Sequence, residues 1–240
     1  MISIIILAHN EEEHIYSNIN KFIDEAKDLD YEIILVENGS TDETLQICRK
    51  LENDTKGLIR VVSIRKPSYG LAIKRGINEA KGEYLFILEA DYIILNFVRE
   101  GLRLLREGQY EVIVASKRHP ESTDKRGYKR RVLTWGFNSL LRLIFGFKGT
   151  DTHGLKAFTI QSAKHLINLS ETEGEALQTE LILLSEIYNI PIIEIPIQIE
   201  EIRAPTISIL RRVPKVSRAI LDIRKSVRAH KKIVRIMTNL

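Results

Sequence analysis

The sequence has a single cysteine and no long apolar run. Because Cys48 is alone among 240 residues, the chain can form neither an internal disulfide nor a zinc site built on several cysteines. No stretch approaches the roughly 20 apolar residues that span a bilayer. No basic region precedes the apolar segment at residues 2–7, so we expect no signal peptide. These absences favour a protein of a reducing compartment such as the cytoplasm.

Two common nucleotide-binding signatures are also missing. The first apolar segment is not followed by a G-x-G-x-x-G motif, and the P-loop lysine motif occurs nowhere in the chain. A Gly-rich loop at the first helix therefore does not hold a phosphate. If a nucleotide binds, the charge of its phosphates must be balanced by other groups.

Charge is distributed unevenly along the chain. The net formal charge is +4, but residues 211–240 contain ten Lys and Arg and one acid, so this segment carries about +9 and residues 1–210 about −5. Its apolar residues fall at helical spacing, which predicts a basic amphipathic helix suited to an anionic membrane surface or to a partner helix. It contains no aromatic residue for base stacking, so we expect no specific binding of nucleic acid.

Short apolar runs alternate with helical patterns in the first half. Strands buried on both faces and separated by helices are typical of a mostly parallel sheet that helices cover on both sides, which is the α/β class. We expect strands at 2–8, 31–37, 58–64, 83–89 and 110–116, and helices at 11–27 (with Asn10 as the N-cap), 42–51 and 69–80.

The second half is less regular. Residues 133–147 form an unusually apolar helix, which belongs either to the core or to a lipid interface beside the basic residues before it. We predict one α/β domain at residues 1–208 and a basic amphipathic helical tail at 209–240. The remaining expected elements are a loop at 122–131, a strand at 151–159, a helix at 176–188 and a strand at 190–199.

Three of the predicted strands end in polar segments. Ligands of an open parallel sheet bind at the carboxyl ends of its strands, so these segments are expected to lie at one edge and to form one site. Polar turns follow most strands, and each segment alone is weak evidence. The segments are Ala8-His9-Asn10-Glu11, Glu37-Asn38-Gly39-Ser40-Thr41-Asp42 and Glu89-Ala90-Asp91.

The third segment is suited to a divalent cation. Glu89 and Asp91 place two carboxylates one residue apart at a strand end. Hard oxygen ligands of this kind favour Mg²⁺ or Mn²⁺, which can bridge to a diphosphate. The sequence therefore predicts a site for a metal and a diphosphate.

At this point the chain resembles the family 2 glycosyltransferases of the GT-A fold, and more narrowly the dolichol-phosphate mannose synthases and their prenyl-phosphate relatives. The resemblance covers roughly residues 2–208. It rests on the order and spacing of four segments. They are residues 8–11 for P-x-x-N-E, 36–44 for V-D-D-G-S-x-D-x-T, 70–76 for part of G-x-x-x-A-x-x-x-G, and 82–91 for G-D-x-x-x-x-x-D-A-D.

The resemblance implies roles on the donor side. Glu89 and Asp91 would contact the metal and the diphosphate of a GDP- or UDP-hexose, and Asp42 would cap the next helix or shape the nucleoside pocket. Two departures concern the metal site. Glu89 replaces the usual first Asp, and Ile93 stands where a polar residue is common. The other expected donor contacts are Ala8, Asn10, Glu11, Glu37, Asn38, Gly39, Ser40, Gly70, Lys74 and Ala90.

The narrower resemblance concerns the acceptor. Residues 151–158 are similar to the D-x-T/S-G-F-R-A-Y segment of the prenyl-phosphate enzymes, and residues 178–180 to their Q-x-E segment. The E-D pair that supplies a base in many relatives is absent, and a phosphate acceptor, being already anionic, needs no base. Cations would hold it instead. The expected acceptor groups are Lys117, Arg118, Arg130, Arg131, Gln178, Glu180 and Arg203, with Lys117 and Arg131 at the reacting phosphate.

These features imply an inverting transfer of a hexose, of the GDP-mannose or UDP-glucose type, to a polyprenyl or dolichyl phosphate. The enzyme would be peripheral on the cytoplasmic face of an anionic membrane, and a homo-oligomer is compatible with the sequence. One alternative is transfer to a saccharide hydroxyl, with Glu180 or Asp151 as the base. Another is a membrane-associated nucleotide-sugar-binding protein without activity. A sugar-phosphate nucleotidyltransferase is disfavoured because its Gly-rich N-terminal loop is absent.

Overall fold

The computed structural model describes residues 1–125, 127–199 and 209–238, with the side chains of the last helix described between 217 and 236. The strands are β1 (Ile2–Ala8), β2 (Tyr31–Asn38), β3 (Ile59–Ile64), β4 (Tyr84–Glu89), β5 (Val112–Ser116), β6 (Thr123–Asp124), β7 (Lys156–Thr159), β8 (Ile192–Pro196) and β9 (Gln198–Ile199). The helices are α1 (Ile15–Glu25), α2 (Thr44–Asp54), α3 (Tyr69–Glu79), α4 (Leu95–Arg106), α5 (Tyr128–Phe145), α6 (Ile160–Leu169), α7 (Ala176–Ile187) and α8 (Ile209–Thr238).

A seven-stranded sheet with the order β3-β2-β1-β4-β7-β5-β8 forms the centre of the molecule. Only β7 runs antiparallel to its neighbours among the paired strands of this sheet. Every residue of β1 is buried, as expected for a central strand that is covered on both faces. The predicted α/β class and mostly parallel sheet are thereby confirmed.

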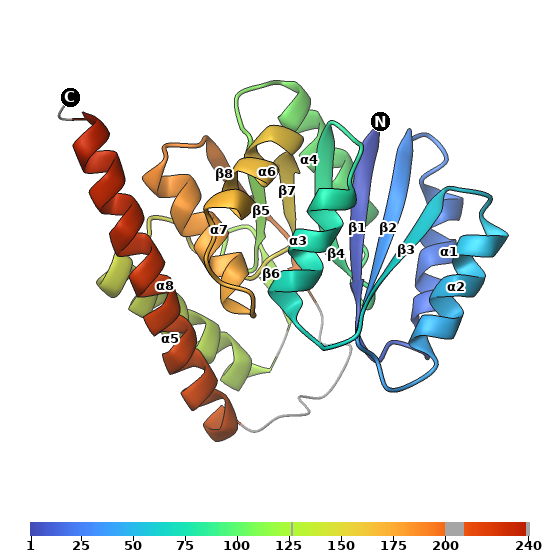
Figure 1. Cartoon of the computed structure of the whole chain (residues 1–240), viewed down its shortest axis with the longest axis horizontal. Helices are drawn as coiled ribbons and strands as arrows, with labels where there is room; N and C mark the ends of the chain where they lie inside the picture. The colour runs from blue at the N-terminus through green and yellow to red at the C-terminus, as the bar shows by residue number, and fades with distance from the viewer. Residues whose placement is uncertain (126, 200–208, 239–240) are drawn as a thin grey trace.

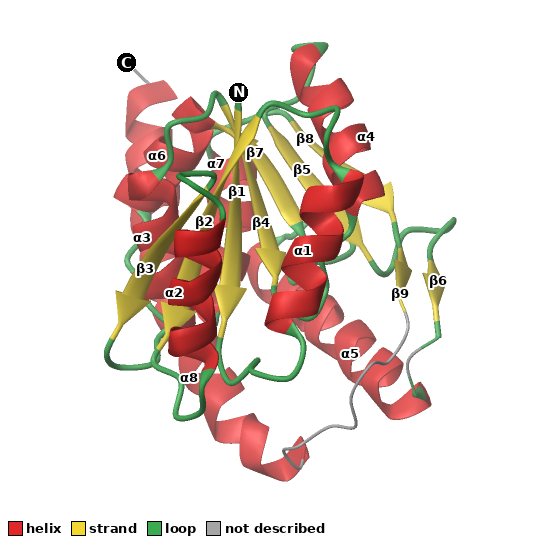
Figure 2. Cartoon of the chain, turned by 90° about the vertical axis from the view of Figure 1, so that its right-hand side faces the viewer, coloured by secondary structure: helices red, strands yellow, loops and turns green. Residues whose placement is uncertain are grey.

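Helices cover both faces of the sheet (Figures 1 and 2). On one face α1, α2 and α4 pack against alternate residues of the strands, such as Ile4 and Ile6 of β1. On the other face α3, α6, α7 and parts of α5 and α8 pack against the intervening residues, such as Ile5 and Leu7. This alternation follows from the two-residue period of a strand. It also decides which helices can reach a given strand-end side chain.

The structure corrects several predicted boundaries. Asn10 does not cap the first helix, which begins at Ile15, because Asn10 has a left-handed backbone with a φ of 55° and faces the loop after β2. The region expected to be a strand from residue 151 is irregular as far as Leu155. The expected loop at 122–131 contains β6 and the first turn of α5, and the strand at 190–199 is divided into β8 and β9. The sequence patterns missed α4 and α6 altogether.

The basic tail forms a long helix that docks on the domain. Ile220, Ile223 and Val227 of α8 are buried in the same core as α7. His230 bonds through its ring nitrogens to the Tyr188 hydroxyl and the Leu169 carbonyl, at 2.8 and 3.1 Å, and Lys231 Nζ donates to the Phe145 carbonyl at the end of α5. The middle of the amphipathic face is therefore covered by protein. Within the described residues, no helix is long and apolar enough to span a membrane.

Candidate active site

The three polar strand ends meet at one edge of the sheet. Strand β1 lies between β2 and β4, with Ala8 in register with Glu37 and Leu7 in register with Glu89. Parallel pairing places the carboxyl ends of all three strands together, as the sequence predicts. In Figure 2 the arrowheads of β1, β2 and β4 point to this edge, on the side where α5 lies.

Hydrogen bonds join the loop after β1 to the loop after β2. The Asn10 N–H donates to Ser40 Oγ, and Asn10 Oδ1 accepts from the Thr41 N–H at 2.8 Å. The Glu11 N–H donates to Thr44 Oγ1, also at 2.8 Å. These bonds fix two loops that lie about 30 residues apart in sequence. The left-handed conformation of Asn10 follows from this role, because asparagine tolerates that conformation better than most residues.

The end of β2 is buried and strongly constrained. Glu37 accepts hydrogen bonds from the Ser40 N–H at 2.5 Å and from the Ser63 hydroxyl at 2.7 Å, so its carboxylate holds the turn that follows. Asn38 accepts from the Ser68 N–H through Oδ1. Gly39 has a φ of 66°, and a Cβ there would lie 2.8 Å from the Pro67 ring. The segment Glu37-Asn38-Gly39-Ser40 therefore has a fixed shape, with Asn38 and the turn at the site edge.

Asp42 precedes Glu43, the N-cap of α2, and its carboxylate accepts hydrogen bonds from the first residue of that helix. Its Oδ1 accepts from the Thr44 N–H at 3.0 Å and from the Thr44 hydroxyl at 2.6 Å, and Oδ2 accepts from the Glu12 N–H. Slight burial would raise the pKa of Asp42, but these donors outweigh it and lower the pKa. Asp42 therefore shapes the pocket through its neighbours.

Glu89 and Asp91 lie on a tight turn at the end of β4. The Tyr69 hydroxyl donates to Glu89 Oε1, while the Asp91 side chain makes no hydrogen bond to any described residue. Glu89 keeps some solvent exposure but is closely surrounded by protein. Desolvation, together with the charges of Asp91 and Glu11, raises the pKa of Glu89 to about 7, against the opposing effects of Tyr69 and Lys156. The ionised form of Glu89 is thus disfavoured in this structure, and a bound divalent cation would favour it.

The two carboxylates fit the metal expected from the sequence. No group of three or more His, Cys, Asp or Glu side chains with metal-binding geometry occurs in the described part of the chain. Mg²⁺ needs few protein ligands, because it commonly binds through one or two carboxylates plus substrate phosphates and retains several waters. Glu89 and Asp91 would hold such a cation, and the phosphates of a nucleotide would complete its ligands.

The structure adds two residues that sequence reasoning missed, Tyr69 and Lys156. Tyr69 begins α3 and accepts from Gln178 Nε2 at 2.5 Å, besides donating to Glu89. Lys156 Nζ donates to Gln178 Oε1 and to the Gly154 carbonyl, and only 2% of Lys156 is exposed. Burial, with the charge of Lys117, lowers the pKa of Lys156 to about 7 despite Asp151 and Glu89. Two sequence signals pointed to Lys156: it stands at the Arg position of the D-x-T/S-G-F-R-A-Y segment, and it is a lysine inside an otherwise apolar strand pattern.

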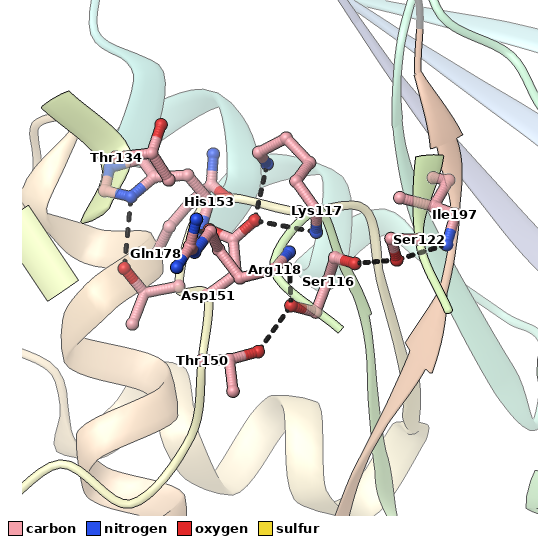
Figure 3. A network of polar contacts seen from close by, with 12 residues as sticks. Ser116, Lys117, Arg118, Ser122, Thr134, Thr150, Asp151, His153, Gln178 and Ile197 are labelled. Carbon is pink, nitrogen blue, oxygen red and sulfur yellow. Dashed lines mark hydrogen bonds and ion pairs between the residues drawn. The ribbon is translucent and has the colours of Figure 1, made fainter. Parts of the chain in front are cut away.

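A buried ion pair lies next to this group. Asp151 is 1% exposed, and its Oδ2 lies 2.8 Å from Lys117 Nζ, while Oδ1 accepts from the His153 N–H (Figure 3). Burial would raise the pKa of Asp151, but the Lys117 charge and these donors outweigh it and lower the pKa. Ser116 extends the network to Thr150 and Ser122, which connects the end of β5 to the chain before β7.

One model of a known family matches most of the chain. The glycosyl transferase family 2 model covers residues 3–166. The chain belongs to this family. The resemblance noted in the sequence is therefore confirmed, and the protein is a glycosyltransferase.

Several characterised glycosyltransferases are similar to this chain in sequence. The dolichyl-phosphate beta-glucosyltransferase of Dictyostelium discoideum is 29% identical over 84% of this chain and 67% of its own length. The Homo sapiens enzyme of the same name is 28% identical over 84% of this chain and 68% of its own length. Glycosyltransferase AglD of Haloferax volcanii is 23% identical over 83% of this chain and 33% of its own length.

Solved structures agree on the fold. The glucosyl-3-phosphoglycerate synthase of Mycobacterium tuberculosis, solved with Mn²⁺, UDP and glucosyl-3-phosphoglycerate, gives a TM-score of 0.68 at 21% identity and covers 95% of this chain and 80% of that chain. Staphylococcus aureus TarS gives 0.55 at 20% identity, over 81% of this chain and 57% of that chain. The glycosyltransferase therefore has the predicted GT-A fold.

Several residues expected at the donor site have other contacts in this glycosyltransferase. Ala8 and Ala90 pack in the core on the α1 side, and the backbone N–H and carbonyl of Ala90 bond to the Leu7 carbonyl and to Asn18 Nδ2. Gly70 makes room for the carbonyl of Glu173, which would lie 2.4 Å from a Cβ at that position. Lys74 donates to the Ser170 carbonyl at the end of α6. These residues support the fold around the site.

On the acceptor side, Glu180 also turns away from the expected position. It is fully buried, and its carboxylate accepts from the N–H groups of Glu171 and Thr172 and from the Thr172 hydroxyl. Gln178 uses both ends of its amide on Lys156 and Tyr69. The polar side chains of the Q-x-E segment, Gln178 and Glu180, therefore bond to other residues inside the protein.

The basic residues expected around the acceptor lie on two segments. Lys117 and Arg118 directly follow β5, where Arg118 is exposed and Lys117 faces Asp151. Arg130 and Arg131 lie in the first turn of α5, with Arg131 exposed. Arg203 lies outside the described residues. Both segments lie toward the end of the molecule where the parallel strands end and α5 begins (Figure 2).

Proposed function

We propose that this glycosyltransferase moves glucose from UDP-glucose to a polyprenyl phosphate, with inversion at the anomeric carbon. The relatives from Dictyostelium discoideum and Homo sapiens, whose names specify a dolichyl-phosphate acceptor and a glucosyl group, support this choice. The synthase of the same fold was solved with UDP and Mn²⁺, which supports a uridine donor and a divalent cation. Of the two donor types that the sequence left open, UDP-glucose is therefore favoured over GDP-mannose.

The observation that carries the acceptor assignment is that both candidate bases are occupied. Asp151 is paired with Lys117, and Glu180 is bound to the loop at residues 171–172. Transfer to a saccharide hydroxyl would require one of them to remove a proton. A phosphate monoester is anionic at neutral pH and can attack without a base. The arrangement of these two acids therefore favours a phosphate acceptor over a sugar acceptor.

A single displacement follows from this arrangement. The loops after β1 and β2 would hold the nucleoside, and Glu89 and Asp91 would orient the diphosphate through a shared cation. An oxygen of the acceptor phosphate bonds to the anomeric carbon while the bond from that carbon to UDP breaks, and the electron pair leaves with UDP. A bound divalent cation supplies electrostatic stabilisation of the charge on the departing diphosphate. Lys117, Arg118 and Arg131 would bind and orient the acceptor phosphate.

The acceptor would be reached at a membrane surface. The outward face of α5 carries large apolar side chains without a cover among the described residues, such as Tyr128, Trp135 and Leu143, which are 78%, 55% and 84% exposed. The first turn of the same helix carries an exposed cation, Arg131, which is three residues from Tyr128 and four from Trp135. Apolar and basic groups on one helix are typical of interfacial attachment. We propose that α5 contacts the bilayer on its cytoplasmic face without spanning it.

The test is a matrix of donors and acceptors. UDP-glucose, UDP-galactose, GDP-mannose and GDP-glucose are each incubated in detergent with a polyprenyl phosphate or with free saccharides, with Mg²⁺ or Mn²⁺. We expect β-linked glucosyl product from UDP-glucose and polyprenyl phosphate, and a loss of at least about 100-fold in kcat for Asp91→Asn. Asp222→Asn, an exposed acid of α8, is the matched control and should retain full activity. Transfer only to saccharides, retention of configuration, or no loss in Asp91→Asn would refute the proposal.

A further inference from the structure

The side-chain amine of Lys156 is buried, and no carboxylate of the described residues pairs with it directly. It forms no salt bridge within the described part of the chain, and both oxygens that it contacts, on Gly154 and Gln178, are neutral. A buried charge is costly unless opposite charge compensates it. The nearest chain of polar contacts leads from Lys156 through Gln178 and Tyr69 to Glu89.

The hydrogen bonds of this chain share one direction when Lys156 is protonated and Glu89 is ionised, which is the state in which Glu89 can bind a cation. An ammonium can only donate, so Gln178 must present its oxygen to Lys156 and its NH₂ group to Tyr69. A carboxylate can only accept, so the Tyr69 hydroxyl must donate to Glu89. All three bonds therefore point from the cation toward the carboxylate, an alignment in which each bond polarises the next.

The sheet explains why these residues meet. Lys156 is directly opposite Ile87 in the antiparallel pair of β7 and β4, and Glu89 is two residues further along β4. Residues two apart on a strand share a face, so the side chains of Lys156 and Glu89 both lie on the face covered by α3 and α7. Tyr69 belongs to α3 and Gln178 to α7, and these two side chains fill the space between the charges.

We infer that Tyr69, Gln178 and Lys156 are positioning residues that hold the Glu89 carboxylate in place for a divalent cation. This inference rests on the proposed function of the same site. Glutamate has one more rotatable bond than aspartate, and Tyr69 restrains it by binding Oε1. Oε2 then remains for the cation. Partners that orient a metal ligand in this way typically change metal affinity about 10–100-fold when they are removed.

The primary test measures metal affinity instead of turnover. Mn²⁺ is titrated into the full chain with saturating UDP, and free Mn²⁺ is followed by electron paramagnetic resonance. Tyr69→Phe removes one hydroxyl and keeps the ring, and we expect its Mn²⁺ dissociation constant to rise about 10-fold. Tyr188→Phe is the matched control, because it also removes a hydroxyl bonded between helices, at His230. It should bind Mn²⁺ as the unaltered chain does.

Gln178→Glu provides a second variant, which keeps the size of the side chain and adds one negative charge beside Lys156. The new carboxylate would pair with Lys156 but could no longer donate to Tyr69, and it would compete with Glu89 for the Tyr69 proton. We expect weaker Mn²⁺ binding with an unchanged thermal unfolding midpoint. Unaltered Mn²⁺ affinity in both Tyr69→Phe and Gln178→Glu would overturn the inference.

A double-variant cycle distinguishes action through Glu89 from a general effect on the site. If Tyr69 acts through Glu89, adding Tyr69→Phe to Glu89→Gln should change Mn²⁺ affinity less than about 2-fold, and a full loss of about 10-fold in that background would overturn the inference. The proposed function is checked separately in the same titration by Asp91→Asn. If UDP binding does not depend on Mn²⁺ and Asp91→Asn has no effect, the metal site itself fails. A normal Asp91→Asn loss with no Tyr69 effect rejects only the positioning role.

Discussion

At the scale of single residues, the acids near the site are of two kinds. Some have carboxylates bonded to other protein groups, and one has a carboxylate that is open to a ligand. Asp151 and Glu180 are buried with every oxygen engaged, whereas Asp91 makes no hydrogen bond to any described residue. A carboxylate that keeps open coordination positions can bind a cation at little structural cost. A carboxylate bound by an ammonium and backbone N–H groups cannot leave them without exposing buried charge.

The Asp151–Lys117 pair yields a stability prediction. Asp151→Asn removes one member of a buried pair and leaves the Lys117 charge uncompensated, so we expect the free energy of unfolding to fall by about 3 kcal/mol. The folded pKa of Asp151 is lowered, so its contribution is fully present above the ordinary aspartate pKa of about 4 and is lost as the pH falls through the folded value. Urea denaturation of both proteins at pH 7 and in mild acid measures the difference, which should shrink in acid.

An exposed pair is the control for this prediction. Asp28 bonds to Arg99 at the surface, where solvent screens the interaction, so Asp28→Asn should leave the urea midpoint unchanged. Equal losses in the free energy of unfolding for Asp28→Asn and Asp151→Asn would show that the effect of Asp151→Asn does not come from burial of its ion pair.

At the scale of secondary-structure elements, backbone packing explains the motif around residue 154. A Cβ on Gly154 would lie 1.7 Å from the carbonyl oxygen of Ala115 in β5. This clash involves the backbone of β5, which cannot move aside as a flexible side chain could. Gly154→Ala should therefore lower the free energy of unfolding by at least about 3 kcal/mol. A Cβ on Gly136, inside α5, would instead project into open space. Gly136→Ala should stabilise by about 0.5–1 kcal/mol. Thermal and urea unfolding should show a lower free energy of unfolding for Gly154→Ala and a higher one for Gly136→Ala. Equal changes in the two variants would contradict the close approach at Gly154.

The strands and helices also show which parts of the fold and of the site could be predicted from the sequence. The strands β1, β2 and β4 and their polar ends were predictable because continuous apolar runs are followed by acids and amides, as at Glu37 and Glu89. Helix α4 was missed although its apolar residues recur at helical spacing, and α6 is short. The chain from Lys156 to Glu89 could not be predicted, because it joins four elements whose contacts exist only in the folded sheet.

At the scale of the whole molecule, α5 and α8 lie together on one side of the domain (Figure 1). The face of α8 that contains Ile223 and Val227 packs on the core, and cations project from its exposed positions, including Arg224, Lys225 and Arg228. The tail carries a net charge of about +9, while the remainder of the chain is net negative. An anionic membrane would therefore orient the molecule with α8 toward the surface, and α5 with it.

The two helices should contribute to membrane binding in physically different ways. Vesicles of neutral lipid in which about a third of the molecules are anionic are mixed with the protein, and the bound fraction is measured by sedimentation. Replacing Arg224, Lys225 and Arg228 by Gln should weaken binding about 100-fold at low salt, since each cation contributes about 1 kcal/mol. At roughly 1 M salt this difference should vanish, because screening then acts within about 3 Å.

The apolar contribution should behave in the opposite way. Trp135→Ser with Leu143→Ser removes two exposed apolar side chains from α5 and leaves the charge unchanged, so the loss of vesicle binding should persist at high salt. Tyr16→Ser, which removes an exposed aromatic side chain from α1 on the other face of the sheet, is the control and should have no effect. If neither the α5 nor the α8 variants weaken binding, this side of the molecule is not the membrane surface, and the acceptor must reach the strand ends by another route.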